Sequence, residues 1–232
     1  MPSSSVDLDG VPEDESGAEI SQAEETVAFL LSLRAKGIRD TGVLRAMEMV
    51  PRDLFAPRRF ADLARADVSL PLPCGQTMTA PATIAAMLVE LGVEPHHRVL
   101  EVGTGSGYVS AVLGRMGRDV LTVERFRTLA IAATERIGAL GLQHVRITTG
   151  DGLAIGPEIG PFDRVLLNGT VAEVPKGLRD ALALGGRLVG ARLIDGAARL
   201  FRVQRTGEGI LVEEGRETVK LPPLAAGAAR AL

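Results

Sequence analysis

The chain has 232 residues, 46% of them hydrophobic, which is enough for one large α/β domain or two small ones. Its single cysteine excludes an internal disulfide and a cysteine-based zinc site, and its three histidines have no metal-ligand spacing, so we expect no metal. The formal net charge is −3, but six acids lie within residues 1–20, so the remainder is only mildly basic and does not indicate a nucleic-acid-binding protein.

The first part of the chain predicts helices and irregular structure without a strand pattern. Residues 1–19 are acidic and rich in serine, which predicts a disordered arm. Ser21 and Glu24 have the spacing of a helix capping box, and the amphipathic helix that follows is expected to stop at Gly37. Shorter helical or irregular segments are expected at residues 42–49 and 52–66. Residues 20–80 therefore form an N-terminal helical and irregular extension.

From residue 97 onward the pattern changes to strands and helices that alternate with short links. Strands are expected at residues 98–102, 119–123, 144–148, 162–167, 186–191, 199–204 and 210–214. Helices are expected at residues 82–91, 108–116, 126–140 and 176–184. This alternation predicts an α/β fold with a doubly wound, Rossmann-like sheet, and the last strands lack intervening helices, which predicts an antiparallel C-terminal edge. We expect residues 81–232 to form this domain and to pack as one unit with residues 20–80.

The strongest motif is VLEVGTGSGY at residues 99–108, where a buried strand leads through glycines into a helix. Glycines permit positive φ angles and let a ligand approach the backbone, while the helix N-terminus offers free N–H groups. The spacing of Gly103, Gly105 and Gly107 differs from the dinucleotide fingerprint, and Glu101 would repel a pyrophosphate. A carboxylate there suits a ligand with an amino group, such as the methionine part of S-adenosylmethionine.

Two further acids follow the next two strands. Glu124 lies 21 residues after Gly103, where an acid in a doubly wound sheet binds ribose hydroxyls; a surface pair with Arg125 or Arg127 is the alternative. Asp151 is placed to accept from an adenine amino group beside Gly152, and an ordinary Asp-Gly turn is the alternative. Ligands bind at the carboxyl ends of such strands. The pattern therefore resembles a class I S-adenosylmethionine-dependent methyltransferase.

A second motif, GQTMTAP at residues 75–81, precedes the glycine loop. With MVPRDLFAP before it and PFDRVLLNGT and GGRLV after the loop, it resembles the protein-L-isoaspartate O-methyltransferase family, in the same order and over roughly residues 21–224. The resemblance implies an enzyme that methylates the carboxylate of L-isoaspartyl residues in damaged proteins or peptides. The methyl ester would collapse unaided to a succinimide, which hydrolyses partly to normal aspartate, so the implied role is protein repair.

The resemblance also implies roles for individual residues. Thr79 stands where the family usually has a serine whose hydroxyl lies beside the substrate carboxylate and the methyl donor, and residues 20–80 would contribute to the active site through it. Gln76 and Thr77 match the family pattern and would help to form the pocket. For Thr79, capping of the following helix is the alternative. The residues expected to bind S-adenosylmethionine, and its product S-adenosylhomocysteine, are Glu101, Gly103, Thr104, Gly105, Ser106, Glu124, Arg125, Asp151, Gly152 and Asn168.

Two segments depart from the family pattern. Asn168-Gly169-Thr170 replaces a small apolar run in a loop expected beside the acceptor, and residues 192–198 lack the expected loop near the substrate peptide. Alternative functions are therefore a methyltransferase of the same fold with another acceptor and a cofactor-binding homologue that has lost turnover. A nicotinamide dehydrogenase is disfavoured by Glu101 and the glycine spacing.

The sequence shows no targeting signal or membrane segment. No apolar run approaches ~18 residues, and the N-terminus has neither the basic start nor the apolar stretch of a secretory signal. We expect a cytoplasmic monomer whose partners are isoaspartyl-containing proteins or peptides, with no nucleic acid and no membrane.

Overall fold

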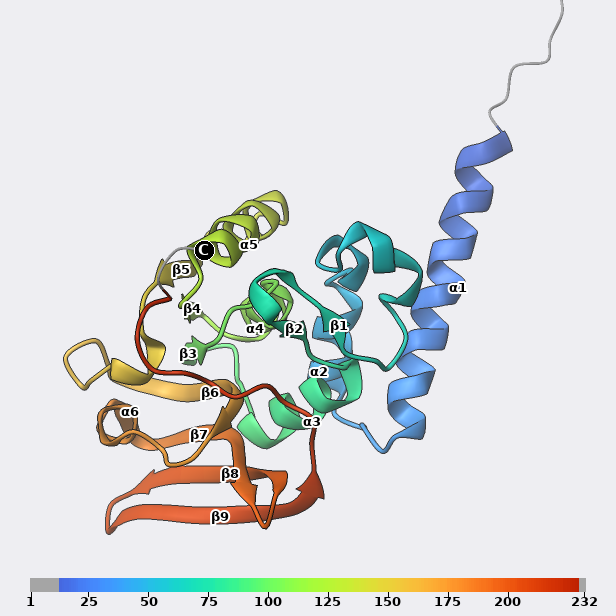
Figure 1. The fold of residues 1–232 in the computed structure, drawn as a ribbon. Helices are drawn as coiled ribbons and strands as arrows, with labels where there is room; N and C mark the ends of the chain where they lie inside the picture. Colours follow the sequence, from blue (N-terminus) through green and yellow to red (C-terminus); the bar gives the residue numbers. More distant parts are fainter. Residues whose placement is uncertain (1–12, 230–232) are drawn as a thin grey trace, which may run out of the picture.

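A seven-stranded sheet forms the centre of the computed structural model, which describes residues 13–229 (Figure 1). The strand order is β5-β4-β3-β6-β7-β8-β9. The strands span β3 Arg98–Val102, β4 Asp119–Glu124, β5 Val145–Thr149, β6 Phe162–Val171, β7 Leu182–Ile194, β8 Ala197–Thr206 and β9 Gly209–Thr218. Pairs from β5 to β7 are parallel, whereas β7, β8 and β9 pair antiparallel. This confirms the expected doubly wound sheet with an antiparallel C-terminal edge.

The order of strands creates a switch point beside β3. From β3 the chain continues to β4 and β5 on one side, and then returns to place β6 on the other side. In open α/β sheets, ligands bind in the crevice outside the carboxyl ends of the strands at such a point. The topology therefore positions a ligand cleft at the carboxyl end of β3.

Apolar side chains cover both faces of the sheet. The helices are α3 Pro81–Leu91, α4 Tyr108–Met116, α5 Arg127–Ala139 and α6 Lys176–Asp180. Val99 of β3 joins a cluster with α3, α4 and α5, while its neighbours Leu100 and Val102 join a second cluster with α6. Adjacent strand residues point to opposite faces, so β3 is buried on both. Of the helices that the structure describes, none has the length and apolarity that crossing a membrane requires.

The N-terminal extension differs from expectation at its start. Helix α1 spans Glu13–Ala35, so the expected helix start at Ser21 is wrong. Part of the expected disordered arm, residues 13–19, is helical, and residues 1–12 lie outside the described residues. The first turns of α1 project beyond the rest of the molecule, whereas Phe29 and Leu33 near its end are buried (Figure 1).

The rest of the extension contains short elements. These are α2 Thr41–Glu48, the 3-10 helices η1 Arg52–Leu54, η2 Arg58–Leu63 and η3 Pro73–Gly75, and the strands β1 Leu70–Pro71 and β2 Thr77–Met78. The two strands pair antiparallel, so the expectation of an extension without strands is wrong. Two-residue strands are too short to show alternation of apolar and polar residues, which explains why the sequence did not predict them.

Three expected boundaries in the second half are also corrected. The helix expected at residues 176–184 ends at Asp180, because Leu182 already pairs with Phe162 in the sheet. Strand β6 continues to Val171, so residues 168–170 belong to a strand and not to a loop. Residues 192–198 form the end of β7, a tight turn and the start of β8. The turn residues Asp195 and Gly196 have φ angles of 51° and 78°, as in a two-residue hairpin.

The end of the chain returns to the carboxyl ends of the strands. After β9, residues 221–229, here named the C-terminal strap, cross the sheet toward β5 and α5 (Figure 1). Pro223 forms a parallel bridge with Thr170 of β6, and Leu224 N donates to Thr170 O at 2.8 Å. The strap therefore lies where the topology positions a ligand.

Candidate active site

The glycine loop turns the chain from β3 into α4. Gly103 and Gly105 have φ angles of 95° and 55°, values that residues with a side chain rarely adopt. A Cβ at Gly103 would lie 3.2 Å from Leu224 Cδ2. Thr104 and Ser106 are buried, with Thr104 Oγ1 2.6 Å from Thr122 Oγ1 and Ser106 Oγ accepting from Tyr108 N at 3.3 Å. These two side chains hold the loop, which presents its backbone to the ligand cleft.

Glu101 is fully buried behind the loop. Its carboxylate accepts hydrogen bonds from Ser110 Oγ, from Thr122 Oγ1 at 2.8 Å and from Asn168 Nδ2 at 3.4 Å. Burial raises the pKa of Glu101 to about 7, although the hydroxyl donors oppose this shift. Asn168 lines the ligand cleft and also donates to Gly103 O at 3.1 Å. Glu101 is therefore linked to the cleft through the Asn168 amide.

Glu124, at the end of β4, is buried and lines the cleft. Its Oε2 accepts from Gly105 N at 2.8 Å and its Oε1 from Phe126 N at 3.0 Å. A carboxylate has about four lone-pair sites, so both oxygens can still accept from a ligand. The alternative of a surface ion pair with Arg125 or Arg127 does not apply, because Glu124 is buried and makes no ion pair with any residue that the structure describes.

Asp151 follows β5 and lies at the N-cap of the 3-10 helix η4 Gly152–Ala154. Its Oδ1 accepts from Leu153 N at 2.9 Å and its Oδ2 from Gly227 N of the strap at 2.6 Å. A Cβ at Gly152 would lie 2.6 Å from Val102 Cγ1, so this glycine is needed for packing against β3. Asp151 thus makes the turn that was the alternative interpretation, and it also lines the cleft.

A cleft lies at the switch point, outside the carboxyl ends of the central strands. It brings together most of the residues expected to hold a ligand, namely Gln76, Thr77, Gly103, Gly105, Glu124, Arg125, Asp151, Gly152 and Asn168. Glu101, Thr104 and Ser106 do not line it, because their side chains are buried behind the loop.

The strap supplies cleft residues that the sequence did not reveal. Pro222, Pro223, Leu224 and Ala225 line the cleft. Thr170 N donates to Pro222 O at 2.8 Å, and Ala229 N donates to Arg125 O at 3.1 Å. The segment LPPLAAGAA has neither helical nor strand periodicity, and its prolines and glycine indicate only an irregular segment. No sequence signal therefore connected it with the glycine loop.

The GQTMTAP motif lies across the glycine loop from the strap. Thr79 is 5% exposed and lines a small cavity with Thr104, Ser106 and Tyr108. This cavity shares three lining residues with the larger cleft, Thr77, Gly105 and Asn168, so the two spaces adjoin. The motif therefore connects the cleft at the switch point with a small space lined by hydroxyl groups.

Thr79 does not cap helix α3. The N-cap position is Ala80, and Asp67 Oδ1 accepts instead from Ala82 N at 2.8 Å. Within residues 13–229, the Thr79 hydroxyl has no hydrogen-bond partner. The capping alternative is therefore wrong, and this hydroxyl is available to a molecule in the small cavity.

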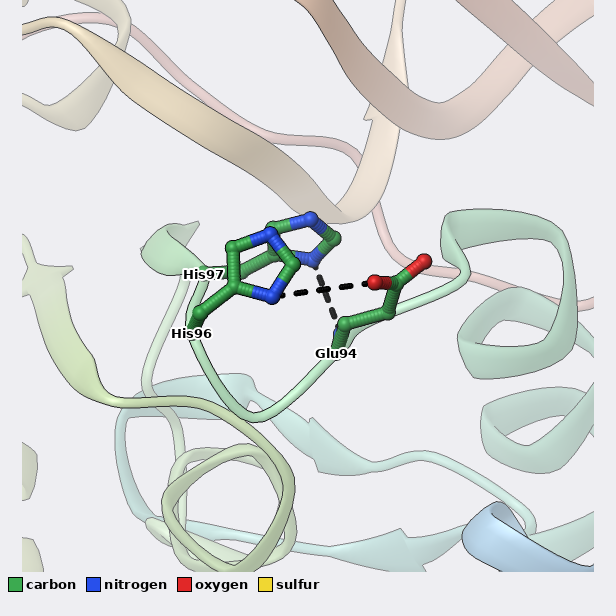
Figure 2. Close-up of side chains that lie close together, drawn as sticks. All are labelled: Glu94, His96 and His97. Atoms are coloured by element: carbon green, nitrogen blue, oxygen red, sulfur yellow. Dashed lines mark hydrogen bonds and ion pairs between the residues drawn. The ribbon is translucent and has the colours of Figure 1, made fainter.

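Figure 2 shows a second cluster of polar side chains, Glu94, His96 and His97. They lie just before β3, at its amino end, whereas the cleft lies at its carboxyl end. His97 Nδ1 accepts from Glu94 N at 2.8 Å, and His96 Nδ1 lies 3.7 Å from Glu94 Oε2. Because Nδ1 accepts, the proton of neutral His97 lies on Nε2, and neither ring nitrogen offers a free lone pair to a metal. Burial and the charges of Arg164 and His96 lower the pKa of His97, which favours this neutral form. The cluster therefore stabilises a turn.

A family model described as "Protein-L-isoaspartate(D-aspartate) O-methyltransferase (PCMT)" matches residues 24–229. The chain belongs to this family. The match confirms the resemblance that the sequence motifs indicated, and it includes the strap. It also covers every residue that lines the cleft and the small cavity.

Relatives of known name support the same assignment. "Protein-L-isoaspartate O-methyltransferase 2" of Rhodopseudomonas palustris (strain HaA2) is 45% identical over 215 residues, covering 92% of this chain and 98% of the relative. A "Protein-L-isoaspartate O-methyltransferase" of Xanthobacter autotrophicus is 46% identical over 173 residues, covering 75% of this chain and 79% of the relative. The chain therefore spans most of the length of these family members.

Solved structures agree with the fold. A structure titled as a putative protein-L-isoaspartate O-methyltransferase from Plasmodium falciparum, in complex with S-adenosyl-L-homocysteine, aligns with a TM-score of 0.76 at 24% identity and covers 85% of this chain and 97% of that one. A second, titled protein-L-isoaspartate O-methyltransferase, aligns with a TM-score of 0.76 at 23% identity, covering 87% and 66%. At this identity the likeness concerns the fold, which is a class I methyltransferase fold with N-terminal helices.

Proposed function

We propose that the chain transfers a methyl group from S-adenosylmethionine to the carboxylate of L-isoaspartyl residues in damaged proteins or peptides. Family membership supports this reaction class. The observation that carries the proposal is the pair of adjoining spaces, a cleft lined by the acids that follow the strands and a small cavity lined by hydroxyls, which share Thr77, Gly105 and Asn168. A transfer between two bound molecules requires such neighbouring sites.

The cleft residues fit the methyl donor. S-adenosylmethionine carries N–H donors on adenine, hydroxyls on ribose and an amino group on its methionine part, and carboxylates are the acceptors that suit them. Asp151 would bind the adenine end, Glu124 the ribose and Asn168 the methionine end, with Glu101 acting from behind the loop through the Asn168 amide. Gly103 and Gly105 have no side chain, so a ligand can approach their backbone closely. Their positive φ angles would be strained for residues with a side chain. Thr104 and Ser106 would act by holding this loop.

The acceptor site needs no proton transfer. A carboxylate has a reference pKa of about 4 and is already ionised near neutral pH. The chain therefore has to position an oxygen of the acceptor, and it needs no general base. When bound, S-adenosylmethionine supplies an electrophilic methyl group on a sulfonium. The Thr79 and Thr77 hydroxyls donate to the acceptor carboxylate and orient one oxygen toward the cleft; Thr79 belongs to the buried part of the cavity lining and Thr77 to its exposed part. No histidine, cysteine or lysine is among the residues that line either space, as far as the structure describes the chain.

The proposed product explains a repair role. A methyl ester is a better electrophile than a carboxylate, so the next backbone nitrogen attacks it and methanol leaves. The resulting succinimide opens with water, partly to normal aspartate, without help from this chain. The partners are therefore isoaspartyl-containing proteins or peptides, while a monomeric state, a cytoplasmic location and independence from nucleic acid stay predictions.

One feature favours a different acceptor for the same fold. Asn168 lines both spaces and stands where the family usually has a small apolar run, and it presents an amide that can donate to or accept from an acceptor. An acceptor other than an isoaspartyl carboxylate is therefore the second candidate, and loss of turnover is the third.

The deciding experiment uses radiolabelled S-adenosylmethionine and two peptides that differ only in an isoaspartyl or an aspartyl residue. The expected result is a base-labile methyl ester on the isoaspartyl peptide alone. Absence of label on both peptides, with measurable S-adenosylhomocysteine binding, would refute the proposed acceptor. Label on other cellular proteins or small molecules in that case would support the second candidate, and its absence would support the third.

A further inference from the structure

A buried arginine connects the GQTMTAP motif with the helix that follows the glycine loop. Arg52, the first residue of η1, is only 2% exposed and is among the largest fully buried side chains. Arginine is almost never fully buried unless it is paired. Its surroundings therefore require an explanation.

The partners of Arg52 are main-chain carbonyls. Its Nη1 donates to Ala64 O, and its Nη2 donates to Thr79 O at 2.9 Å and to Val68 O at 3.4 Å. The planar guanidinium presents several N–H donors in a fixed fork, which suits carbonyls at three positions along one irregular segment. One side chain thus fixes the path of residues 64–79, including the peptide that carries Thr79.

The other side of the guanidinium faces the glycine-loop helix. Arg52 Cζ lies 5.7 Å from the centroid of the Tyr108 ring, and Tyr108 is the first residue of α4. Tyr108 is 1% exposed and packs edge-on against Phe55, with ring centroids 5.7 Å apart. Arg52 therefore touches both the acceptor motif and the element that starts where the glycine loop ends.

The burial of Arg52 is unfavourable by itself, because the guanidinium loses its hydration. Arg52 makes no ion pair with a carboxylate in the part of the chain that the structure describes, and its Nε has no hydrogen-bond partner there. Burial lowers the pKa of Arg52 to about 10, with the nearby Tyr108 and Asp67 acting in the opposite direction. A buried cation without a carboxylate partner is disfavoured by desolvation. An apolar side chain would avoid this cost but would leave three carbonyls without their donor.

We propose that Arg52 is a positioning residue for the methyl transfer. Arg52 donates to Thr79 O and contacts the Tyr108 ring, and these two interactions hold the Thr79 hydroxyl opposite the glycine loop across the small cavity. None of the residues that line this cavity is cationic. The proposal rests on the proposed function, because the positioned hydroxyl is the one assigned to the acceptor carboxylate.

The test compares Arg52→Lys with Arg52→Met. Lysine retains the positive charge but cannot bind three carbonyls in one plane, so both variants should lose activity to a similar extent. We expect kcat on the isoaspartyl peptide to fall roughly 100-fold in each, since displacement of a reacting group by about 1 Å costs that much. The dissociation constant of S-adenosylhomocysteine should change less than about twofold. Amide hydrogen exchange at residues 76–80 should increase in both variants.

Arg164 provides the matched control. It is also an arginine that donates to main-chain carbonyls, Gly92 O at 2.9 Å and Asp163 O at 2.8 Å. It lies near the amino end of β6 and lines neither the cleft nor the small cavity. Arg164→Lys should leave kcat within about twofold. Added guanidinium should restore part of kcat to Arg52→Ala, which a general loss of stability would not allow.

Several results would overturn the proposal. These are full activity in Arg52→Lys, a parallel loss of S-adenosylhomocysteine binding, and failure of both variants to fold, which would make Arg52 a stability residue alone. The wild-type assay separates this outcome from failure of the proposed function. If wild type does not label the isoaspartyl peptide, the acceptor assignment fails. If wild type labels it and Arg52→Lys does so equally well, the role of Arg52 fails.

Discussion

The two halves of the candidate site are built in different ways. In the donor half, Glu101, Glu124 and Asp151 lie at or just after the ends of β3, β4 and β5, whose parallel register pairs Glu101 with Thr122 and Glu124 with Thr149. In the acceptor half, Thr79 follows the two-residue strand β2. Arg52 Nη2 donates to its carbonyl, and Asp67 Oδ1 accepts from Ala82 N in the first turn of α3.

The difference concerns how many interactions fix each group. A carboxylate at a strand end is held by a whole ladder of main-chain hydrogen bonds, so one substitution shifts it little. A hydroxyl on an irregular segment is held by a few side-chain to main-chain bonds, each contributing about 1 kcal/mol. Single substitutions should therefore damage the acceptor half through kcat and the donor half through cofactor affinity.

The largest effect is expected at Thr79. Thr79→Val keeps the branched shape but removes the hydroxyl, so kcat/KM for the isoaspartyl peptide should fall roughly 100-fold, because the acceptor oxygen is no longer held in line. S-adenosylhomocysteine affinity, measured by calorimetry, should stay within about twofold. Thr79→Ser retains the hydroxyl and serves as the control, with activity close to wild type. A Thr79→Val enzyme with unchanged kcat/KM would contradict the assignment of this hydroxyl.

A smaller effect is expected from the strap in the donor half. Truncation after Ala225 removes the Gly227 N–H that bonds Asp151 Oδ2 and the Ala229 N–H that bonds Arg125 O. S-adenosylhomocysteine affinity should fall about 10-fold, since loss of a hydrogen bond to a charged group costs ~1.5 kcal/mol or more. The dissociation rate, followed by stopped flow, should rise accordingly.

Truncation after Ala229 is the control for the strap. It retains both amides and should bind S-adenosylhomocysteine like the full chain. Equal affinity in the two truncated forms and in wild type would mean that the strap does not contribute to the donor half.

The same difference between the halves explains what the sequence could predict. The donor half follows from patterns of regular elements. A buried strand precedes Gly103 and acids follow consecutive strands, which predicted that these groups meet at the carboxyl ends of the strands. The strand order confirmed this arrangement. The sequence did not reveal that Asn168, and not Glu101, lines the cleft, because side-chain packing behind a loop leaves no periodic signal.

The acceptor half and the strap required tertiary structure. Arg52 reads as an ordinary charged residue in VPRDLF, and nothing in its spacing links it to carbonyls 12, 16 and 27 residues away. The strap depends on contacts between Asp151 and Gly227, which are 76 residues apart. Family resemblance pointed to Thr79, but only the structure excluded its role as a helix cap.

Protonation of Glu101 gives a further prediction for the donor half. Its folded-state pKa, about 7, lies above the ordinary value of 4.5, so the folded protein binds the extra proton between these values. The resulting stabilisation is complete below about pH 4.5 and is lost as pH rises through 7, at about 1 kcal/mol per pH unit. Urea unfolding without cofactor from pH 5 to 8 should show this loss in wild type and a flatter profile in Glu101→Gln. Parallel profiles would contradict the buried, protonatable state.

The smallest effect is expected at the other end of β3, with the opposite sign. The pKa of His97 is lowered from its ordinary 6.5, so the unfolded chain binds a proton more readily than the folded one. Stability is therefore complete above about pH 6.5 and falls as pH drops through the lowered pKa. His97→Gln keeps an acceptor for Glu94 N and should remove this acid-side loss, whereas His96→Gln should retain it. Because Glu101 and His97 change stability with opposite signs in overlapping pH ranges, each single variant leaves one slope uncompensated, and the double variant should show the flattest unfolding profile of the series.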